Sequence, residues 1–275
     1  MPSDRIIDIR NWFGFKKLPF AVNVNTKDIF LTKSIEQMSS KVRFAIQSGF
    51  YYVVIGDVGS GKSTAMRYAL SQLPSKQYSV ATVISSDRSF PEFLRQCANA
   101  IGAPTKAFQH TTVLRTIFEC YESLRESGIR PVFFIDEAHL LSAETLRQLH
   151  LLTIPNLNSD ISVPIVLCGQ ESLFEKLNYP ICKPVLSRVM DGFNLKSMSN
   201  EESNRYIQHQ ICNIAGGRDD IFDDLSLKAI YQASGGIPRK INSICLLAMQ
   251  KALENQQTSV CADVIREVTR NWWEK

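Results

Sequence analysis

Long hydrophobic runs are absent from this sequence of 275 residues. No apolar stretch approaches the roughly 20 residues that a helix needs to cross a bilayer. The N-terminal residues from Met1 to Arg10 are charged throughout and contain no signal-peptide core. These absences predict a cytoplasmic protein with no membrane span.

Cysteine pairs with the spacing C-x-x-C are also absent. The seven cysteines are scattered and odd in number, so the sequence predicts neither a disulfide framework nor a zinc site. We expect reduced cysteines, most of them in the core.

The sequence also has no large excess of positive or negative charge. The formal net charge of +4 permits binding to nucleic acid or another polyanion without requiring it. Hydrophobic residues make up 44% of the chain, which is enough for the core of one large domain, or of a large and a small one.

A glycine-rich segment follows an apolar run in the first quarter of the chain. The run from Tyr51 to Ile55 is typical of a buried strand, and the residues from Ala65 to Leu70 are compatible with a helix. Between them, the spacing G-x-x-x-x-G-K-S fits the P-loop pattern completely. The segment consists of Gly56, Asp57, Val58, Gly59, Ser60, Gly61, Lys62, Ser63 and Thr64.

This segment predicts a cradle for the phosphates of ATP. Glycines let backbone N–H groups approach phosphate oxygens, and the N-terminus of the following helix adds a positive dipole. We expect Lys62 to reach the β- and γ-phosphates, and Ser63 to bind Mg²⁺ with Thr64 beside it. The alternative is a turn that merely joins a strand to a helix. The strand, loop and helix context favours the phosphate site.

A second apolar run ends in two carboxylates. Residues Pro131 to Ile135 predict a buried strand, and Asp136 and Glu137 follow it. Asp136 is placed to hold Mg²⁺ directly or through water, and Glu137 to polarise the water that attacks the γ-phosphate. Such pairs also occur at helix N-termini because of the helix dipole, but after a P-loop the pair is a Walker B signature. We interpret His139 as a structural or hydrogen-bonding neighbour rather than a base.

Three further polar residues are candidates for contacts with the nucleotide. Gln170 follows a strand predicted over residues 162–168, where it would face the γ-phosphate as a sensor, or would only form a turn. Arg188 is a candidate arginine finger acting across a subunit interface, or an ordinary surface or ion-pairing arginine. Arg239 lies in the first turn of a predicted helix, where its charge is unfavourable for the helix dipole. We therefore expect Arg239 to reach the phosphates from a lid.

The remaining pattern predicts an α/β domain followed by helices. A further strand is predicted over 79–84, with helices over 34–48, 89–101, 111–127 and 143–152. From Asn200 the β pattern stops, and helices are predicted over 201–215, 224–233, 238–254 and 259–273. The predicted domains are a lead-in over 1–33, an α/β nucleotide-binding domain over 34–197 and a helical lid over 198–275. The aromatic residues of the lead-in either line the base pocket or cover the edge of the core.

The order of these motifs resembles that of the AAA+ ATPases, and more closely that of the ExeA/GspA-type family. The resemblance runs from about Asn11 to about Ala252. Its motifs are Phe13-Gly14-Phe15 with Pro19-Phe20, Gly56 to Ser63, Phe134 to Leu141, Gly169-Gln170 and Ser234 to Asn242. It implies an α/β P-loop NTPase (AAA+) fold, in which helices flank a parallel sheet and a small all-helical lid follows.

The same resemblance implies an enzyme that hydrolyses ATP to ADP and phosphate. The implied roles are Walker A over 56–64, Walker B at Asp136 and Glu137, sensor 1 at Gln170, arginine finger at Arg188 and sensor 2 at Arg239.

Members of this family differ in their partners. Secretion ATPases continue into a transmembrane helix and a peptidoglycan-binding region, whereas this sequence stops after the lid. Compact members resemble transposon helper ATPases of the TniB, IstB, MuB and TnsC types, which form ATP-dependent oligomers on DNA. The resemblance therefore implies a homo-oligomer, ring or filament, that assembles on double-stranded DNA and recruits a transposase or integrase. A secretion or assembly ATPase acting on protein partners is the alternative, and a signalling or defence ATPase is a third possibility.

Overall fold

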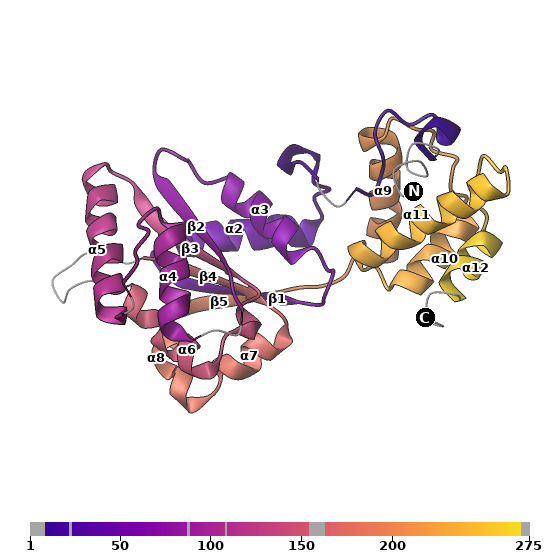
Figure 1. Ribbon diagram of the computed structural model, residues 1–275. Coiled ribbons are helices and arrows are strands. Elements are labelled where there is room, and N and C mark those ends of the chain that lie inside the picture. The colour runs from indigo at the N-terminus through magenta and orange to yellow at the C-terminus, as the bar shows by residue number, and fades with distance from the viewer. Residues whose placement is uncertain (1–8, 22–23, 87–88, 108, 154–162, 271–275) are drawn as a thin grey trace. The chain divides into compact units, whose positions relative to one another are not determined.

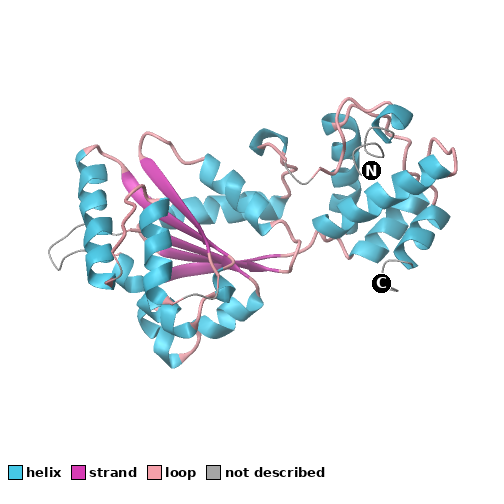
Figure 2. Cartoon of the chain, in the orientation of Figure 1, coloured by secondary structure: helices cyan, strands magenta, loops and turns pink. Residues whose placement is uncertain are grey.

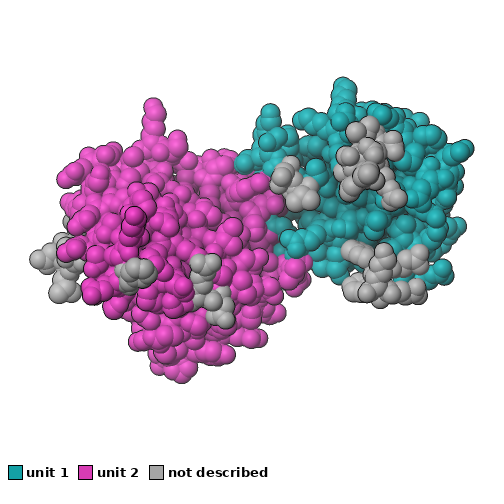
Figure 3. Space-filling view, viewed as in Figure 1, with its two compact units in different colours: residues 1–32, 59–61, 196–275 teal, residues 33–58, 62–195 magenta. Residues whose placement is uncertain are grey.

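Residues 9–21, 24–86, 89–107, 109–153 and 163–270 are described in the computed structural model of the protein (Figure 1). The chain divides into two compact units (Figure 3). Unit 1 comprises residues 1–32, 59–61 and 196–275, and unit 2 comprises residues 33–58 and 62–195.

Unit 2 is built on a parallel sheet, as the sequence predicts. In the described part of the chain this sheet, whose strands are magenta in Figure 2, has five strands in the order β2-β3-β4-β1-β5, and every neighbouring pair is parallel. The strands are β1 (Tyr51–Gly56), β2 (Tyr78–Ile84), β3 (Arg130–Asp136), β4 (Ile165–Gly169) and β5 (Val189–Leu195). Parallel neighbours require crossover connections. The order inserts β4 between β1 and β3. Position 162, the first residue of the strand predicted before Gln170, lies outside the described residues.

Helices cover both faces of the sheet. Tyr52 and Val54 of β1 pack with α2 (Lys33–Gln47) and α3 (Lys62–Ser71) on one face. Tyr51 and Val53 belong to the core on the other face, with α4 (Phe90–Ala100) and α5 (His110–Glu126). Successive side chains of a strand point to opposite faces. Because both faces are covered, β1 needs apolar residues at every position, which explains its continuous apolar run.

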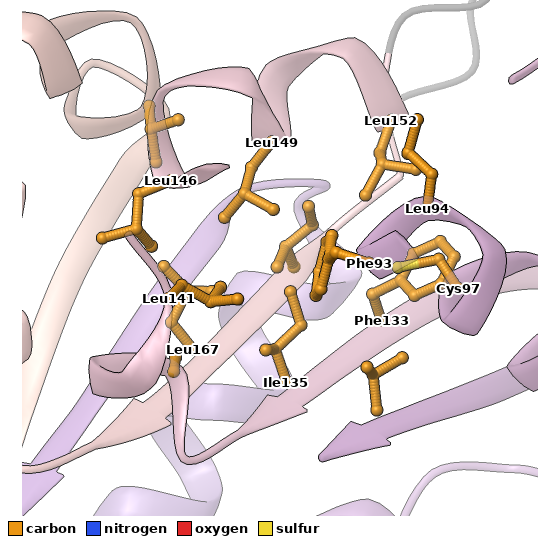
Figure 4. Packing of buried hydrophobic residues seen from close by; sticks show 14 of the residues in the cluster. Phe93, Leu94, Cys97, Phe133, Ile135, Leu141, Leu146, Leu149, Leu152 and Leu167 are labelled. Atoms are coloured by element: carbon orange, nitrogen blue, oxygen red, sulfur yellow. The ribbon is translucent and has the colours of Figure 1, made fainter. Parts of the chain in front are cut away.

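One of the two cores of unit 2 lies between the sheet and α4 (Figure 4). Phe133 and Ile135 of β3 and Leu167 of β4 pack in the same cluster as Phe93 and Cys97 of α4. Each fully buried side chain of this size contributes roughly 1.5–3 kcal/mol to the hydrophobic term. Further leucines of this cluster, from the segment after β3, are Leu141, Leu146, Leu149 and Leu152.

Short helical segments follow β3 and β4. After β3 come η2 (Ala138–Leu140), α6 (Ala143–Gln148) and η3 (Leu149–Leu152), and after β4 come α7 (Glu171–Leu177), η4 (Pro180–Cys182) and α8 (Lys183–Leu186). The Ser142 hydroxyl begins α6 by accepting the Thr145 N–H at 3.1 Å. The helix predicted over 143–152 is therefore present, with its second half as a 3-10 helix.

The edge strand β5 is the strand that the sequence analysis did not predict. In the described residues it pairs on one side only, with β1. Asp191 and Gly192 at its middle are exposed and of types that are depleted in strands, so the local pattern is weak. Lys41 of α2 pairs with the Asp191 carboxylate at 3.0 Å, and this contact lowers the pKa of that carboxyl.

Unit 1 carries the helices of the C-terminal third. They are α9 (Asn200–Gln208), the π-helical η5 (His209–Ile214), α10 (Asp224–Ser234), α11 (Pro238–Glu254) and α12 (Ala262–Arg270). A capping box begins α9, because Ser199 Oγ accepts the Glu202 N–H at 3.1 Å and Glu202 Oε2 accepts the Ser199 N–H at 2.9 Å. Of the helix predicted over 259–273, residues 271–273 lie outside the described residues. No helix in the described part of the chain is both long enough and apolar enough to cross a bilayer.

The lead-in packs within unit 1. It includes the short helix η1 (Thr26–Asp28). Phe13, Phe15 and Phe20 are buried in the same core as residues of α11 such as Ile241. The Phe20 N–H donates to Gln210 Oε1 at 3.1 Å. These aromatic residues therefore belong to the core of unit 1.

Candidate nucleotide-binding site

The predicted site residues of unit 2 converge at one edge of its sheet. β1 ends at Gly56, β3 at Asp136 and β4 at Gly169. Ligands bind beyond the carboxyl ends of parallel strands, which all lie at the same edge. Because β4 lies between β1 and β3, Gln170 follows the strand that separates the phosphate loop from Asp136 and Glu137. The strand order therefore brings together three segments that are far apart in the sequence.

The phosphate loop bends through two glycines. Gly59 has φ 81° and Gly61 has φ 90°, a left-handed conformation that side chains rarely allow. α3 begins directly afterwards at Lys62, with Ser63 and Thr64 in its first turn. The first N–H groups of a helix have no partner within the helix and are available to an anion. The loop and the helix start therefore fit a phosphate group.

Lys62 is held over the beginning of this loop. Its Nζ donates to the carbonyl oxygens of Gly56 at 2.9 Å and Asp57 at 2.8 Å. The lysine is buried, with 8% of its surface exposed, whereas Val58 in the loop is 58% exposed. The ammonium is thereby placed at the beginning of the loop. That Lys62 reaches the β- and γ-phosphates stays a prediction.

The charges of Lys62, Asp136 and Glu137 act on the same buried groups. Burial raises the pKa of the Cys168 thiol well above its usual range, and the Asp136 charge raises it further while the Lys62 charge lowers it. Burial lowers the pKa of His139. The Glu137 charge raises this pKa, and the Lys62 charge lowers it. The cation of the phosphate loop and the two carboxylates therefore share one small region.

Asp136 is held by the backbone at the end of β3. Its Oδ1 accepts the Glu137 N–H at 2.9 Å, and its carbonyl oxygen accepts the Ser85 N–H at 2.9 Å and the Ser85 hydroxyl at 2.8 Å. The Ser63 hydroxyl and the Asp136 carboxylate are hard oxygen donors of the kind that Mg²⁺ prefers. The residues predicted as metal ligands therefore fit this ion chemically.

Glu137 adopts an unusual backbone conformation. Its φ of 52° and ψ of 33° lie in the left-handed region, where an L-residue costs roughly 1–2 kcal/mol. Backbone strain of this kind clusters at functional sites, where the surrounding structure holds it. The extended conformation of β3 therefore ends at Asp136, directly before Glu137.

His139 contacts two of the predicted site residues. Its Nε2 lies 2.9 Å from Nε2 of Gln170, and its Nδ1 lies 3.4 Å from Oε2 of Glu137 without forming a hydrogen bond. The prediction that His139 is a hydrogen-bonding neighbour is confirmed. Gln170 is the N-cap residue of α7, and its role as a sensor stays a prediction.

Lys176 is a residue of this region that the sequence analysis missed. Its Nζ donates to the carbonyl oxygens of His139 at 2.6 Å and Leu141 at 2.9 Å. A lysine on a short helix belongs to no local motif, so only the tertiary contact identifies it.

Arg188 lies away from the other predicted site residues of unit 2. It precedes β5, and its carbonyl oxygen accepts the N–H of Tyr51, the first residue of β1. Arg188 is therefore at the amino edge of the sheet, opposite the edge that carries Gly56. Its Nη1 donates to the carbonyl oxygen of Pro184 at 2.7 Å. A role for Arg188 in a neighbouring subunit stays a prediction.

Arg239 is an exposed residue in the first turn of α11 in unit 1. Residues 59–61 group with the same unit, and the Arg239 N–H donates to the Gly59 carbonyl oxygen at 3.3 Å. A Cβ added at Gly59 would lie 2.9 Å from Cβ of Arg239. Glycine is therefore required here for a second reason besides its φ. That Arg239 reaches the phosphates stays a prediction.

The fold and the site together define a class of protein. A parallel sheet of this strand order, with a phosphate loop after β1, an Asp-Glu pair after β3 and a C-terminal group of helices, is the P-loop AAA+ fold. The fold class predicted from the sequence is confirmed.

Comparison with known proteins agrees with this class. A family profile described as AAA domain matches residues 47–177. General secretion pathway protein A of Aeromonas hydrophila is 28% identical over 241 residues, which cover 85% of this chain and 43% of that protein. The chain therefore spans less than half the length of this relative. The similarity supports the resemblance to the ExeA/GspA-type proteins.

Solved structures share the fold at low sequence identity. The ORC2 protein of Aeropyrum pernix, in ADPNP-ADP complexes, has a TM-score of 0.71 at 16% identity, covering 93% of this chain and 72% of that chain. The ORC1 protein of Aeropyrum pernix, in complex with DNA, has a TM-score of 0.68 at 14% identity, covering 94% of this chain and 70% of that chain. At these identities the likeness concerns the fold.

Proposed function

We propose that the chain is an ATPase that hydrolyses ATP to ADP and phosphate. The observation that carries this proposal is the convergence of Lys62, Asp136 and Glu137 at the carboxyl edge of one sheet. The phosphate loop binds the phosphates through backbone N–H groups and the Lys62 ammonium. The ADPNP-ADP complexes of the ORC2 protein support nucleotide binding by this fold.

Each residue of the site has a proposed part. Ser63 and Asp136 would hold Mg²⁺, which neutralises charge on the phosphates when bound. The Glu137 carboxylate accepts a hydrogen bond from the attacking water and orients it. Gln170 donates to the γ-phosphate as a sensor, and Arg188 serves the site of a neighbouring subunit.

We further propose that ATP switches the chain between free and DNA-assembled states. Bound ATP favours a homo-oligomer on double-stranded DNA, the assembled chain recruits a transposase or integrase, and hydrolysis releases it. The net charge of +4 supports contact with a polyanion. The ORC1 protein in complex with DNA supports it by showing that another protein of this fold binds DNA.

A second candidate function is an ATPase that acts on protein partners in secretion or assembly. The observation that favours it is the 28% identity with general secretion pathway protein A over 85% of this chain. In this case nucleotide drives assembly, and DNA has no effect on it.

Electron microscopy and DNA binding separate the two candidates. The purified chain is imaged with and without duplex DNA, in a non-hydrolysable ATP analogue and in ADP. Rings or filaments that need both DNA and the analogue support the DNA-switched function, together with DNA affinity that falls steeply with salt. Nucleotide-dependent assemblies that form equally well without DNA support the second candidate.

The Glu137→Gln variant tests the hydrolysis itself. We expect it to bind ATP normally and to lose turnover by orders of magnitude, with the assembled form trapped. The control is Glu126→Gln, which removes the charge of an exposed carboxylate at the end of α5. Wild-type turnover of Glu137→Gln would contradict the proposed role of Glu137.

A further inference from the structure

The segment from Gly169 to Lys176 approaches His139 at three points. Gln170 Nε2 lies 2.9 Å from His139 Nε2. Lys176, at the other end of α7, donates to the carbonyl oxygens of His139 and Leu141 at 2.6 and 2.9 Å. A Cβ added at Gly169 would lie 3.1 Å from the His139 backbone nitrogen. One segment therefore holds both the ring and the backbone of His139.

These contacts determine which ring nitrogen carries the proton. The Nε2 of Gln170 belongs to an NH₂ group, which only donates, so His139 Nε2 accepts. Burial lowers the pKa of His139, so the ring is neutral near pH 7. We therefore assign its single proton to Nδ1.

The Nδ1–H group has one carboxylate at short range. Nδ1 is buried and has no hydrogen-bond partner among the described residues, although Glu137 Oε2 lies 3.4 Å away. The Glu137 side chain is 46% exposed and the His139 side chain 10%. The imidazole is therefore fixed by its surroundings, whereas the carboxylate has room to turn toward it. A buried donor without a partner is unfavourable, which favours that movement.

We propose that His139 is a positioning residue that orients Glu137 and couples it to Gln170. Nδ1–H donates to one oxygen of the Glu137 carboxylate, which leaves the other oxygen for the attacking water. Gln170 holds the ring in the tautomer that makes this donation possible. A displacement of Gln170 at the nucleotide is thereby transmitted to Glu137 through a single ring. This inference rests on the proposed ATP hydrolysis.

Two substitutions of His139 separate its two contacts. His139→Asn places an amide N–H where Nδ1 stands, and keeps the donor toward Glu137. His139→Gln extends an amide toward Gln170 and removes the donor that faces Glu137. We expect His139→Gln to lower kcat roughly 10- to 100-fold, as for a misplaced catalytic group, with the affinity for an ATP analogue unchanged. We expect His139→Asn to keep kcat within about threefold, because the orienting hydrogen bond persists.

The matched control is His150→Gln. His150 is a partly buried histidine of unit 2 whose Nδ1 contacts the Arg147 carbonyl oxygen at 2.7 Å. Among the described residues, His150 forms no hydrogen bond with a proposed site residue. Its replacement should therefore leave kcat unchanged. Wild-type kcat in His139→Gln, or equal losses in His139→Asn and His139→Gln, would overturn the inference.

A measurement without nucleotide tests the ring directly. Nitrogen NMR of ¹⁵N-histidine-labelled wild-type chain should show His139 as the neutral tautomer protonated at Nδ1. Gln170→Ala should give a mixture of tautomers, because the donor that fixes the ring is gone. A wild-type ring protonated at Nε2 would overturn the inference even where the variants fail to fold.

Failure of this inference is distinguishable from failure of the proposed ATPase. If Glu137→Gln loses turnover while His139→Gln keeps it, only the role of His139 is wrong. If Glu137→Gln keeps turnover, the proposed hydrolysis through Glu137 is wrong, and the role of His139 with it.

Discussion

The Nζ atom of Lys62 donates a hydrogen bond to the carbonyl oxygen of Gly56 at 2.9 Å. This bond connects the end of the phosphate loop to its beginning. Residues of the loop between them take left-handed conformations at Gly59 and Gly61. The contact places a buried ammonium within the curve of the loop. Two carbonyl oxygens hold the ammonium, and a bound phosphate would add a stronger, charge-assisted partner.

Replacing Lys62 with Ala should abolish nucleotide binding. Each charge-assisted hydrogen bond contributes about 1.5–3 kcal/mol, which is about 10- to 150-fold in affinity. Because Lys62 is expected to reach two phosphates, we expect the affinity to fall by about 100-fold or more. Calorimetric titration with an ATP analogue measures the change. Lys76→Ala, at an exposed lysine before β2, is the control and should bind normally. Unchanged affinity in Lys62→Ala would remove this residue from the site.

The left-handed backbone of Glu137 predicts that glycine is more stable than alanine at this position. Glu137→Gly and Glu137→Ala both lose the carboxylate, so neither should hydrolyse ATP. Glycine adopts φ 52° without a Cβ penalty, and we expect Glu137→Gly to be about 1 kcal/mol more stable than Glu137→Ala. Urea unfolding of the two variants gives the difference. A more stable alanine variant would show that the left-handed conformation carries no strain.

The lowered pKa of His139 predicts a pH dependence of stability. The unfolded chain, with a histidine pKa near 6.5, binds more protons than the folded chain in the window just below that value. The contribution of His139 is therefore fully present above about pH 6.5 and is lost as the pH falls toward the folded pKa. The charged groups that act on the ring are Glu137, Lys176, Lys62 and Asp136.

Urea midpoints of wild-type chain and His139→Gln, measured between pH 5 and 7, isolate this effect. The wild-type midpoint should fall more steeply on acidification than that of the variant. Parallel curves would show that His139 titrates alike in the folded and unfolded chains.

A role for Arg188 in a neighbouring subunit predicts complementation. Arg188→Ala keeps its own phosphate loop but supplies no arginine, whereas Lys62→Ala supplies the arginine but binds no nucleotide. Each variant alone should be inactive, and a mixture should recover part of the ATPase activity because complete sites form between unlike subunits. Activity is measured as phosphate release at several mixing ratios. No recovery, or full activity of Arg188→Ala alone, would contradict the arginine-finger role.

Two adjacent glycines in unit 1 predict unequal costs of substitution. Gly235 has φ 60° and open space where a Cβ would lie, whereas a Cβ on Gly236 would lie 1.9 Å from the Met198 carbonyl oxygen. The Met198 N–H also donates to the Gly236 carbonyl oxygen at 2.9 Å. Gly235→Ala should cost about 1 kcal/mol from backbone strain alone. Gly236→Ala should cost clearly more, and equal midpoints in urea unfolding would show that the close approach is unimportant.

Most elements were predictable because their signals are local. The apolar run of β1, the glycine spacing after it and the apolar run of β3 each report burial or backbone geometry within a few residues. The same holds for α11, whose start at Pro238 and end at Glu254 agree with the expected helix. The exposed edge strand β5 has no such signal, since Asp191 and Gly192 at its middle are exposed to solvent.

The sequence by itself determined the phosphate loop, the acidic pair and the order of the first four strands and the longer helices along the chain, because spacing and periodicity encode local conformation. The tertiary structure alone decided that β4 stands between β1 and β3 and that His139 meets Gln170. It also decided that the lead-in joins the core of α11. These relationships depend on which surfaces pack together, and packing is a property of residues far apart in the chain that no local pattern records.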